Sequence, residues 1–167
     1  MPSEGHARKR ILLGVCGGVA AFKSALLLRR MQDAGFEVRV VMTEAATRFI
    51  GEATMHALSA HRVYRQLWQA PHFSSGELHV DLSGWADAIV IYPATANFVG
   101  GVSAGPADDL LKLCVACFEG PVLVCPAMHS RMAGHPLHVE ALGRLAAAGL
   151  AVLPCESGRL ASGEEGP

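Results

Sequence analysis

Residues 85–97, WADAIVIYPATAN, constrain the fold more than any other part of the chain. The apolar run at residues 88–92 shows no polar alternation, which is typical of a strand buried on both faces of a parallel sheet. We expect this strand to stop at Pro93, because proline cannot donate to a sheet ladder, and a loop of small residues to follow. Ligands bind at the carboxyl ends of strands in open α/β sheets. The loop at residues 93–97 is therefore a candidate ligand site.

The remaining strands and helices are expected to build a sheet behind this loop. Apolar runs predict strands at residues 10–15, 37–42, 121–125 and 151–153. Helices are expected at residues 19–34, from about Asp108 onward and at residues 139–148, with Gly35 and Gly149 ending the first and last. Two short helices are expected within residues 45–68, and loops at residues 71–76, 100–106 and 126–136.

The order strand, glycine turn, helix, strand at residues 10–42 is a βαβ unit, which requires parallel strands and a right-handed crossover. The sequence therefore predicts an α/β fold of the three-layer, Rossmann-like (flavodoxin-like) type, an open parallel sheet with helices on both faces. The glycine turn lacks the full GxGxxG pattern, so a dinucleotide is not indicated. A mononucleotide phosphate at the following helix N-terminus is compatible with the turn.

Composition limits the classes of partner. With 167 residues we expect a polar tail at residues 1–9 and a single domain at residues 10–167. The net charge of −1 indicates neither nucleic acid nor an anionic membrane, and no apolar run approaches the ~20 residues of a membrane span. A hydrophobic content of 51% favours subunit interfaces. Five cysteines and no apparent signal peptide predict reduced thiols and a cytoplasmic location.

Two side-chain clusters have ordinary structural explanations. Cys114 and Cys117 form a CxxC pair late in a predicted helix, whereas redox pairs lie at helix N-termini, so core packing is favoured. His129, His135 and His138 share one loop without a carboxylate or cysteine at ligand spacing, so we predict no metal.

Five segments occur together in an order that resembles the flavin-dependent cysteine decarboxylases. They are GVCGGVAAFKS, VMTEAATRFI, HVDLSGWADAIVIYPATAN, PADDLL and PAMHSRMAGHP. That family includes 4′-phosphopantothenoylcysteine decarboxylase and the peptidyl-cysteine decarboxylases of ribosomally made peptide natural products. The resemblance implies an FMN cofactor, a homo-oligomer built as a trimer or a dodecamer of four trimers, and FMN pockets walled partly by a neighbouring subunit.

The resemblance also assigns roles to individual residues. His79 matches the catalytic histidine, although a histidine at this position, judged alone, is more often structural. His129, Met132 and Ser162 fall in the substrate-binding motifs, with a substrate clamp near residues 155–167. The implied FMN-binding residues are Gly17, Gly18, Val19, Thr43, Thr95, Ala96, Asn97, Phe98 and Ala127.

The chain departs from the family's pattern in its substrate motifs. His129 replaces an asparagine that contacts the substrate carboxylate, Ala133 replaces a tryptophan, and Phe98 stands where threonine is usual. Ser162 occupies the clamp where the coenzyme A enzymes carry a cysteine that helps to reduce the intermediate. These departures favour oxidative decarboxylation of a precursor peptide's C-terminal cysteine to an aminoenethiol, with 4′-phosphopantothenoylcysteine as the alternative substrate.

Two further functions are compatible with a related fold. One is a flavin prenyltransferase, which the match at His79 and at residues 126–129 disfavours. The other is a flavin-binding regulatory subunit resembling the yeast phosphatase inhibitors, which the presence of His79 disfavours.

Overall fold

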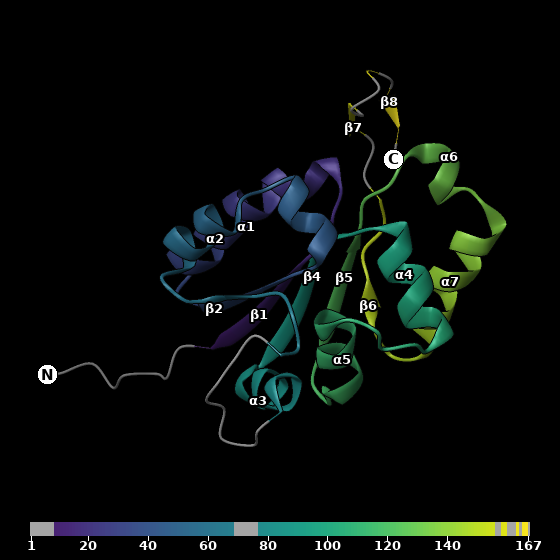
Figure 1. Cartoon of the computed structure of the whole chain (residues 1–167). Coiled ribbons are helices and arrows are strands. Elements are labelled where there is room, and N and C mark those ends of the chain that lie inside the picture. Colours follow the sequence, from purple (N-terminus) through teal and green to yellow (C-terminus); the bar gives the residue numbers. More distant parts are fainter. Residues whose placement is uncertain (1–8, 69–76, 156–157, 160–162, 164, 167) are drawn as a thin grey trace, which may run out of the picture.

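The computed structural model describes residues 9–68, 77–155, 158, 159, 163, 165 and 166 (Figure 1). Its main sheet has six parallel strands in the order β3-β2-β1-β4-β5-β6. This is the doubly wound order, in which the direction of winding reverses between the adjacent strands β1 and β4. The predicted Rossmann-like α/β fold is therefore confirmed. The strands are β1 (Arg10–Val15), β2 (Glu37–Met42), β3 (Val63–Tyr64), β4 (Ala88–Ala94), β5 (Val122–Pro126) and β6 (Ala151–Val152).

Helices cover both faces of the sheet because successive residues of each central strand point to opposite sides. In β1, Leu13 packs with Leu28 of α1 and Met55 of α2, whereas Leu12 belongs to the core formed with the other helices. Figure 1 shows α1 and α2 on one side and α4 and α7 on the other. The helical segments are η1 (Val19–Ala21), α1 (Phe22–Asp33), η2 (Glu44–Arg48), α2 (Glu52–Ser59), α3 (Leu78–Trp85), α4 (Ala96–Ala104), α5 (Leu110–Cys117), α6 (Ser130–Ala133) and α7 (Pro136–Ala147).

The central strand is longer than the sequence predicts. β4 continues through Pro93 to Ala94, so the expected stop at Pro93 is wrong. Proline lacks a donor but keeps its carbonyl, and the Pro93 carbonyl accepts a hydrogen bond of 3.2 Å from the Cys16 amide. The pairing with β5 shifts register between Ile91 and Ala94, which accommodates the missing donor.

The expected loop after β4 is also wrong, because α4 begins at Ala96 and includes most of the glycine-rich segment. Its glycines permit close packing: a Cβ added at Gly101 would lie 2.8 Å from the Lys112 side chain on α5. The helix ends at Gly105, whose φ of 97° is accessible to glycine without strain.

Four short elements escape the sequence pattern. β3 has only two residues and lies in a segment that was expected to be helical, and α6 lies in an expected loop. β7 (Gly158–Arg159) and β8 (Glu165–Gly166) pair as a separate antiparallel ribbon. Elements this short carry too few residues for a periodicity. The loop predicted at residues 71–76 and the tail predicted at residues 1–9, apart from Lys9, lie outside the described residues.

The amino-terminal edge of the sheet is closed by charged and aromatic side chains. Asp87, just before β4, accepts hydrogen bonds from the Arg10 backbone amide at 2.7 Å and from its guanidinium at 3.1 Å. Trp85, the last residue of α3, lies under two guanidinium groups, with the Arg39 Cζ atom 4.2 Å and the Arg10 Cζ atom 5.9 Å from the ring centroid.

Apolar side chains remain exposed on the outer surface of η1 and α1. Val19, Phe22 and Leu26 are 58%, 53% and 59% exposed, as expected of a helix with an apolar face directed away from its own sheet. None of the described helices is long and apolar enough to span a bilayer.

Candidate functional site

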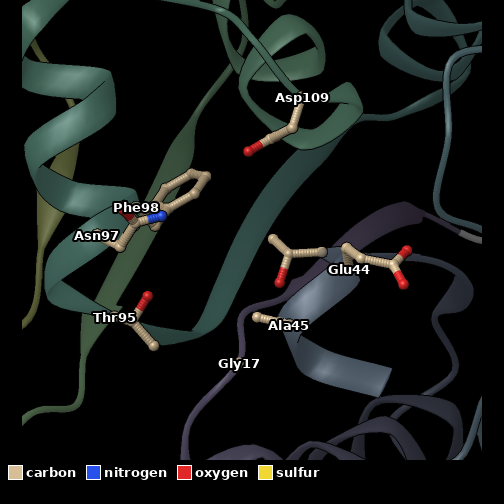
Figure 2. Close-up of a pocket in the computed structure, with 8 residues that line it drawn as sticks. Gly17, Glu44, Ala45, Thr95, Asn97, Phe98 and Asp109 are labelled. Carbon is tan, nitrogen blue, oxygen red and sulfur yellow. The ribbon is translucent and has the colours of Figure 1, made fainter. Parts of the chain in front are cut away.

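A cavity of about 300 Å³ lies at the carboxyl-terminal edge of the sheet. It sits where β1, β2 and β4 end, which is the point where the winding reverses and where open α/β sheets bind ligands. Figure 2 shows the residues around it, which come from well-separated parts of the chain. The lining residues are Gly17, Thr43, Glu44, Ala45, Thr95, Asn97, Phe98 and Asp109.

Two glycines after β1 bring neighbouring turns into close approach. A Cβ added at Gly17 would lie 2.4 Å from the Cβ of Ala45 and 2.5 Å from its carbonyl carbon, distances that side chains do not adopt. A Cβ at Gly18 would lie 3.3 Å from the Thr95 Cγ2 atom. The turn after β1 therefore lies against both η2 and the start of α4, and bare backbone forms part of the cavity wall.

The helical segments that begin around the cavity are capped in two different ways. Thr43 caps η2 by accepting from the Ala46 amide at 3.3 Å, and Asp109 caps α5 by accepting from the Lys112 amide at 2.9 Å. At η1 and α4, the capping residues Gly18 and Thr95 make no side-chain cap hydrogen bond. Amides in these first turns therefore lack a side-chain acceptor and remain suited to an anion.

Lys112 is a buried ammonium behind the cavity wall. Its side chain is 7% exposed, and its Nζ atom lies 2.5 Å from Asp108 Oδ1 and 3.4 Å from Asp109 Oδ2. Burial alone would lower the pKa of Lys112, but the hydrogen bond to Asp108 and the charge of Asp109 raise it above its ordinary value. The ammonium consequently stays charged at neutral pH.

The structure brings most of the predicted FMN-binding residues together. Five of the nine line the cavity, namely Gly17, Thr43, Thr95, Asn97 and Phe98. Gly18 lies next to the cavity, because it approaches the side chain of the lining residue Thr95. Val19 is 58% exposed, and Val19, Ala96 and Ala127 are not among the lining residues.

The predicted substrate residues follow β5 instead. The Ala127 amide donates to the Ala94 carbonyl at 2.9 Å, which places this loop next to the residue that precedes Thr95. His129 caps α6, its Nδ1 atom accepting from the Arg131 amide at 3.2 Å, and Met132 is 42% exposed. Ser162 lies outside the described residues.

His79 lies in the first turn of α3, and its side chain is only 16% exposed. Its Nε2 atom is 3.8 Å from Glu77 Oε2, while its buried Nδ1 atom has no hydrogen-bond partner among the residues that the structure describes. It is not among the residues that line the cavity of its own chain. The catalytic role of His79 therefore stays a prediction.

Sequence reasoning missed Glu44, Ala45 and Asp109 as cavity residues. Glu44 and Ala45 belong to η2, whose approach to the turn after β1 is a contact between distant parts of the chain. Asp109 was expected only to start a helix, which it does. The segment PADDLL, one of the five that carry the family resemblance, contains Asp109 and was the signal available for a role in the cavity.

Two of the loop histidines cap helices, and two of the cysteines are deeply buried. His129 and His135 accept from backbone amides at the starts of α6 and α7. In the described part of the chain, no group of three or more potential ligands could hold a metal ion. Burial raises the pKa of the Cys16 and Cys114 thiols to about 12, so neither is a reactive thiolate at neutral pH.

The cavity offers both a site for the FMN phosphate and hydrogen-bond acceptors for the FMN hydroxyl groups. The open first turns at Gly18 and Thr95 suit a single phosphate group, and the bare backbone at Gly17 lets a planar ring system approach closely. The Asp109 carboxylate and the Thr95 hydroxyl provide acceptors for hydroxyl groups, whereas Figure 2 shows the Glu44 carboxylate directed away from the cavity, where it pairs with Arg65 at 3.5 Å. The volume falls at the lower end of the usual range for small-molecule pockets.

Known proteins resemble the chain in both sequence and fold. The family model described as Flavoprotein matches residues 2–167. Over 161 residues the chain is 44% identical to the coenzyme A biosynthesis bifunctional protein CoaBC of Mycolicibacterium smegmatis and 40% identical to CoaBC of Escherichia coli K12. These matches cover 96% of this chain but only 38% and 39% of the two relatives.

Two solved structures agree closely with the fold. The FMN-dependent cysteine decarboxylase SpaF superposes with a TM-score of 0.86 at 31% identity, covering 96% of this chain and 91% of SpaF. A PPC decarboxylase mutant with serine in place of a cysteine, complexed with pantothenoylaminoethenethiol, gives a TM-score of 0.83 at 30% identity, with coverages of 96% and 89%.

These similarities confirm the family, the cofactor class and the enzyme class predicted from the sequence, because FMN-dependent decarboxylases stand among the neighbours. The two curated relatives at 44% and 40% identity are both CoaBC proteins. The chain belongs to the flavoprotein family that includes the FMN-dependent cysteine decarboxylases.

Proposed function

We propose that this chain decarboxylates the cysteine moiety of 4′-phosphopantothenoylcysteine with FMN as cofactor, and that it works in the cytoplasm. The observation that carries the proposal is the cavity at the winding reversal, with uncapped first turns for a phosphate beside a bare-backbone wall. The 44% identity with a coenzyme A biosynthesis protein supports this substrate over a peptide.

The cofactor would supply the redox step. When bound, FMN would supply a hydride acceptor, so that the cysteine side chain could be oxidised to a C=S group able to receive the electrons left by departing CO2. The chain's own residues provide binding and orientation. The first turns at Gly18 and Thr95 hold the phosphate, Gly17 permits close approach of the ring, and Phe98 contributes an apolar wall.

His79 is the proposed proton acceptor for the oxidation step. Because it does not line the cavity of its own chain, we infer that it acts on a cavity in a neighbouring subunit of a homotrimer or a dodecamer. Its buried, unpartnered Nδ1 atom is compatible with a role completed by subunit contact. The exposed apolar surface of Val19, Phe22 and Leu26 is compatible with such an assembly.

A peptide with a C-terminal cysteine is the second candidate substrate. It is favoured by His129, which stands where the family's carboxylate-binding asparagine is usual. A histidine in that place can hold a carboxylate through a charge-assisted hydrogen bond when it is protonated.

The reaction should release an unsaturated product, because Ser162 is a far weaker acid than the cysteine of the coenzyme A enzymes. Without a thiol to protonate the enethiolate, its reduction should fail and the enethiol should leave. The neighbour with serine in place of a cysteine is complexed with pantothenoylaminoethenethiol, which supports this expectation.

The test is a paired incubation of the FMN-loaded protein with 4′-phosphopantothenoylcysteine and with peptides that end in cysteine, analysed by mass spectrometry. We expect turnover of the former to a product lighter by CO2 and two hydrogens, with oxygen consumed. Preferential turnover of a peptide would move the assignment to the second candidate. A product lighter by CO2 alone, without an external oxidant, would contradict the role given to Ser162.

A further inference from the structure

We propose that Asp109 binds the cofactor directly, its carboxylate accepting a hydrogen bond from one hydroxyl of the FMN ribityl chain, and that Lys112 is the positioning residue for this carboxylate. The inference rests on the FMN binding proposed above. It adds a contact on α5, an element to which neither the sequence motifs nor the strand-end rule assigns a cofactor role.

Asp109 is placed where its carboxylate can reach a ligand in the cavity. It is the N-cap of α5, and Figure 2 shows its carboxylate directed toward the cavity that Gly17 and Thr95 line from other segments. Its Oδ1 atom accepts from the Lys112 amide at 2.9 Å. A carboxylate has about four acceptor sites, so this cap leaves it able to accept from a ligand as well.

Lys112 holds the Asp109 carboxylate from behind. Its ammonium is almost fully buried, 3.4 Å from Asp109 Oδ2, and is also paired with Asp108. Gly101 of α4 makes this possible, since a Cβ there would lie 2.8 Å from both Nζ and Cε of Lys112. The ammonium is thus enclosed between two helices that both contribute to the cavity wall.

The hydroxyl groups of FMN are better partners for the Asp109 carboxylate than the phosphate is. An ionised carboxylate is an acceptor only, and it repels a phosphate, for which the uncapped first turns of η1 and α4 are better placed. The ribityl hydroxyls are donors, and carboxylates in other nucleotide sites bind sugar hydroxyls in this way. The lysine behind Asp109 reduces the net charge that the cofactor's phosphate encounters.

The test is a binding cycle that does not depend on turnover. The apoprotein and its Asp109→Asn variant are titrated with FMN and with FMN analogues that each lack one ribityl hydroxyl, and dissociation constants are taken from flavin fluorescence. Asparagine is an equally good N-cap, so α5 should persist. We expect one analogue to bind the wild type about tenfold more weakly than FMN does, and this difference to disappear in Asp109→Asn.

Asp108→Asn is the matched control, because Asp108 also pairs with Lys112 but is 71% exposed and does not line the cavity. It should retain the full difference between FMN and that analogue. In Lys112→Met, with folding verified by circular dichroism, the coupling between Asp109 and the hydroxyl should shrink. An unchanged coupling would overturn the positioning role.

Each remaining outcome has a distinct meaning. If no analogue shows a difference that depends on Asp109, the contact is wrong while FMN binding stands. If Asp109→Asn strengthens FMN binding alike for every analogue, the carboxylate faces the phosphate instead. If the wild type binds no FMN, the proposed function fails together with this inference.

Discussion

The two edges of the sheet differ in the kinds of residue that they carry. At the carboxyl-terminal edge, bare backbone, small residues and open first turns surround a cavity. At the amino-terminal edge, the Arg10–Asp87 ion pair and the stacking of Arg39 on Trp85 close the sheet. Figure 1 shows α3, which carries His79, at the end of the sheet where β4 begins.

This difference separates cofactor binding from proton transfer within one chain. The carboxyl-terminal edge has what FMN binding requires, whereas the proposed proton acceptor belongs to a helix that does not line the cavity. A single subunit would then bind cofactor without being able to complete the reaction. Variants at each of the two edges test this division.

The replacement His79→Asn should lower decarboxylation by ~10²–10⁴-fold, the usual contribution of a positioned general base. FMN should remain bound, because His79 does not line the cavity. Turnover by mass spectrometry and FMN occupancy by absorbance measure the two effects separately. His135→Asn is a suitable control, since the His135 side chain accepts from the Leu137 amide and is not among the residues that line the cavity. Near-normal turnover by His79→Asn would show that His79, at the amino-terminal edge, takes no part in the reaction.

The replacement Gly17→Ala should weaken FMN binding by about tenfold or more, through ~1–3 kcal/mol of overpacking. Its Cβ would lie 2.5 Å from the Ala45 carbonyl carbon, and backbone yields less readily than a flexible side chain. Gly100→Ala is the control, because an added Cβ there meets nothing within 4 Å. Equal FMN affinity in both variants would show that the close turn does not form the cofactor wall.

Mixing these two variants should restore part of the activity that each lacks. A hybrid oligomer would combine an intact cavity from His79→Asn with an intact histidine from Gly17→Ala. Light scattering of the wild type should give the mass of a trimer or of a multiple of it. A monomeric wild type, or no recovery after subunit exchange, would contradict a site shared between chains.

The smallest effect is expected at the amino-terminal edge. Hydrogen bonding to Arg10 lowers the pKa of Asp87 below the ordinary value of an aspartate, so ionised Asp87 stabilises the fold above that ordinary pKa. The contribution is lost as the pH falls through the lowered folded-state pKa. Asp87→Asn should therefore lower the melting temperature slightly at pH 7, and the difference should vanish in acid. A difference that grew on acidification would contradict the assigned ion pair.

Much of the fold follows from local patterns, and much of the site does not. The runs that form β1, β2, β4 and β5 identify the buried strands, and Gly35 and Gly149, with φ of 89° and 92°, end helices as expected. The strand-end rule found the loop that carries Thr95, whereas Gly17 and Thr43 were identified by the family resemblance. Ala45 and Asp109 enter the cavity through contacts between distant segments, which no local periodicity encodes.

The stacking at Trp85 has an optical consequence. The chain has two tryptophans, of which Trp68 is 91% exposed, while Trp85 lies under Arg39 and Arg10. An aqueous quencher should extinguish Trp68 emission first and leave Trp85 as a reporter of the amino-terminal edge. Because flavins absorb in the region of tryptophan emission, energy transfer from Trp85 would report cofactor loading at the opposite edge of the same sheet.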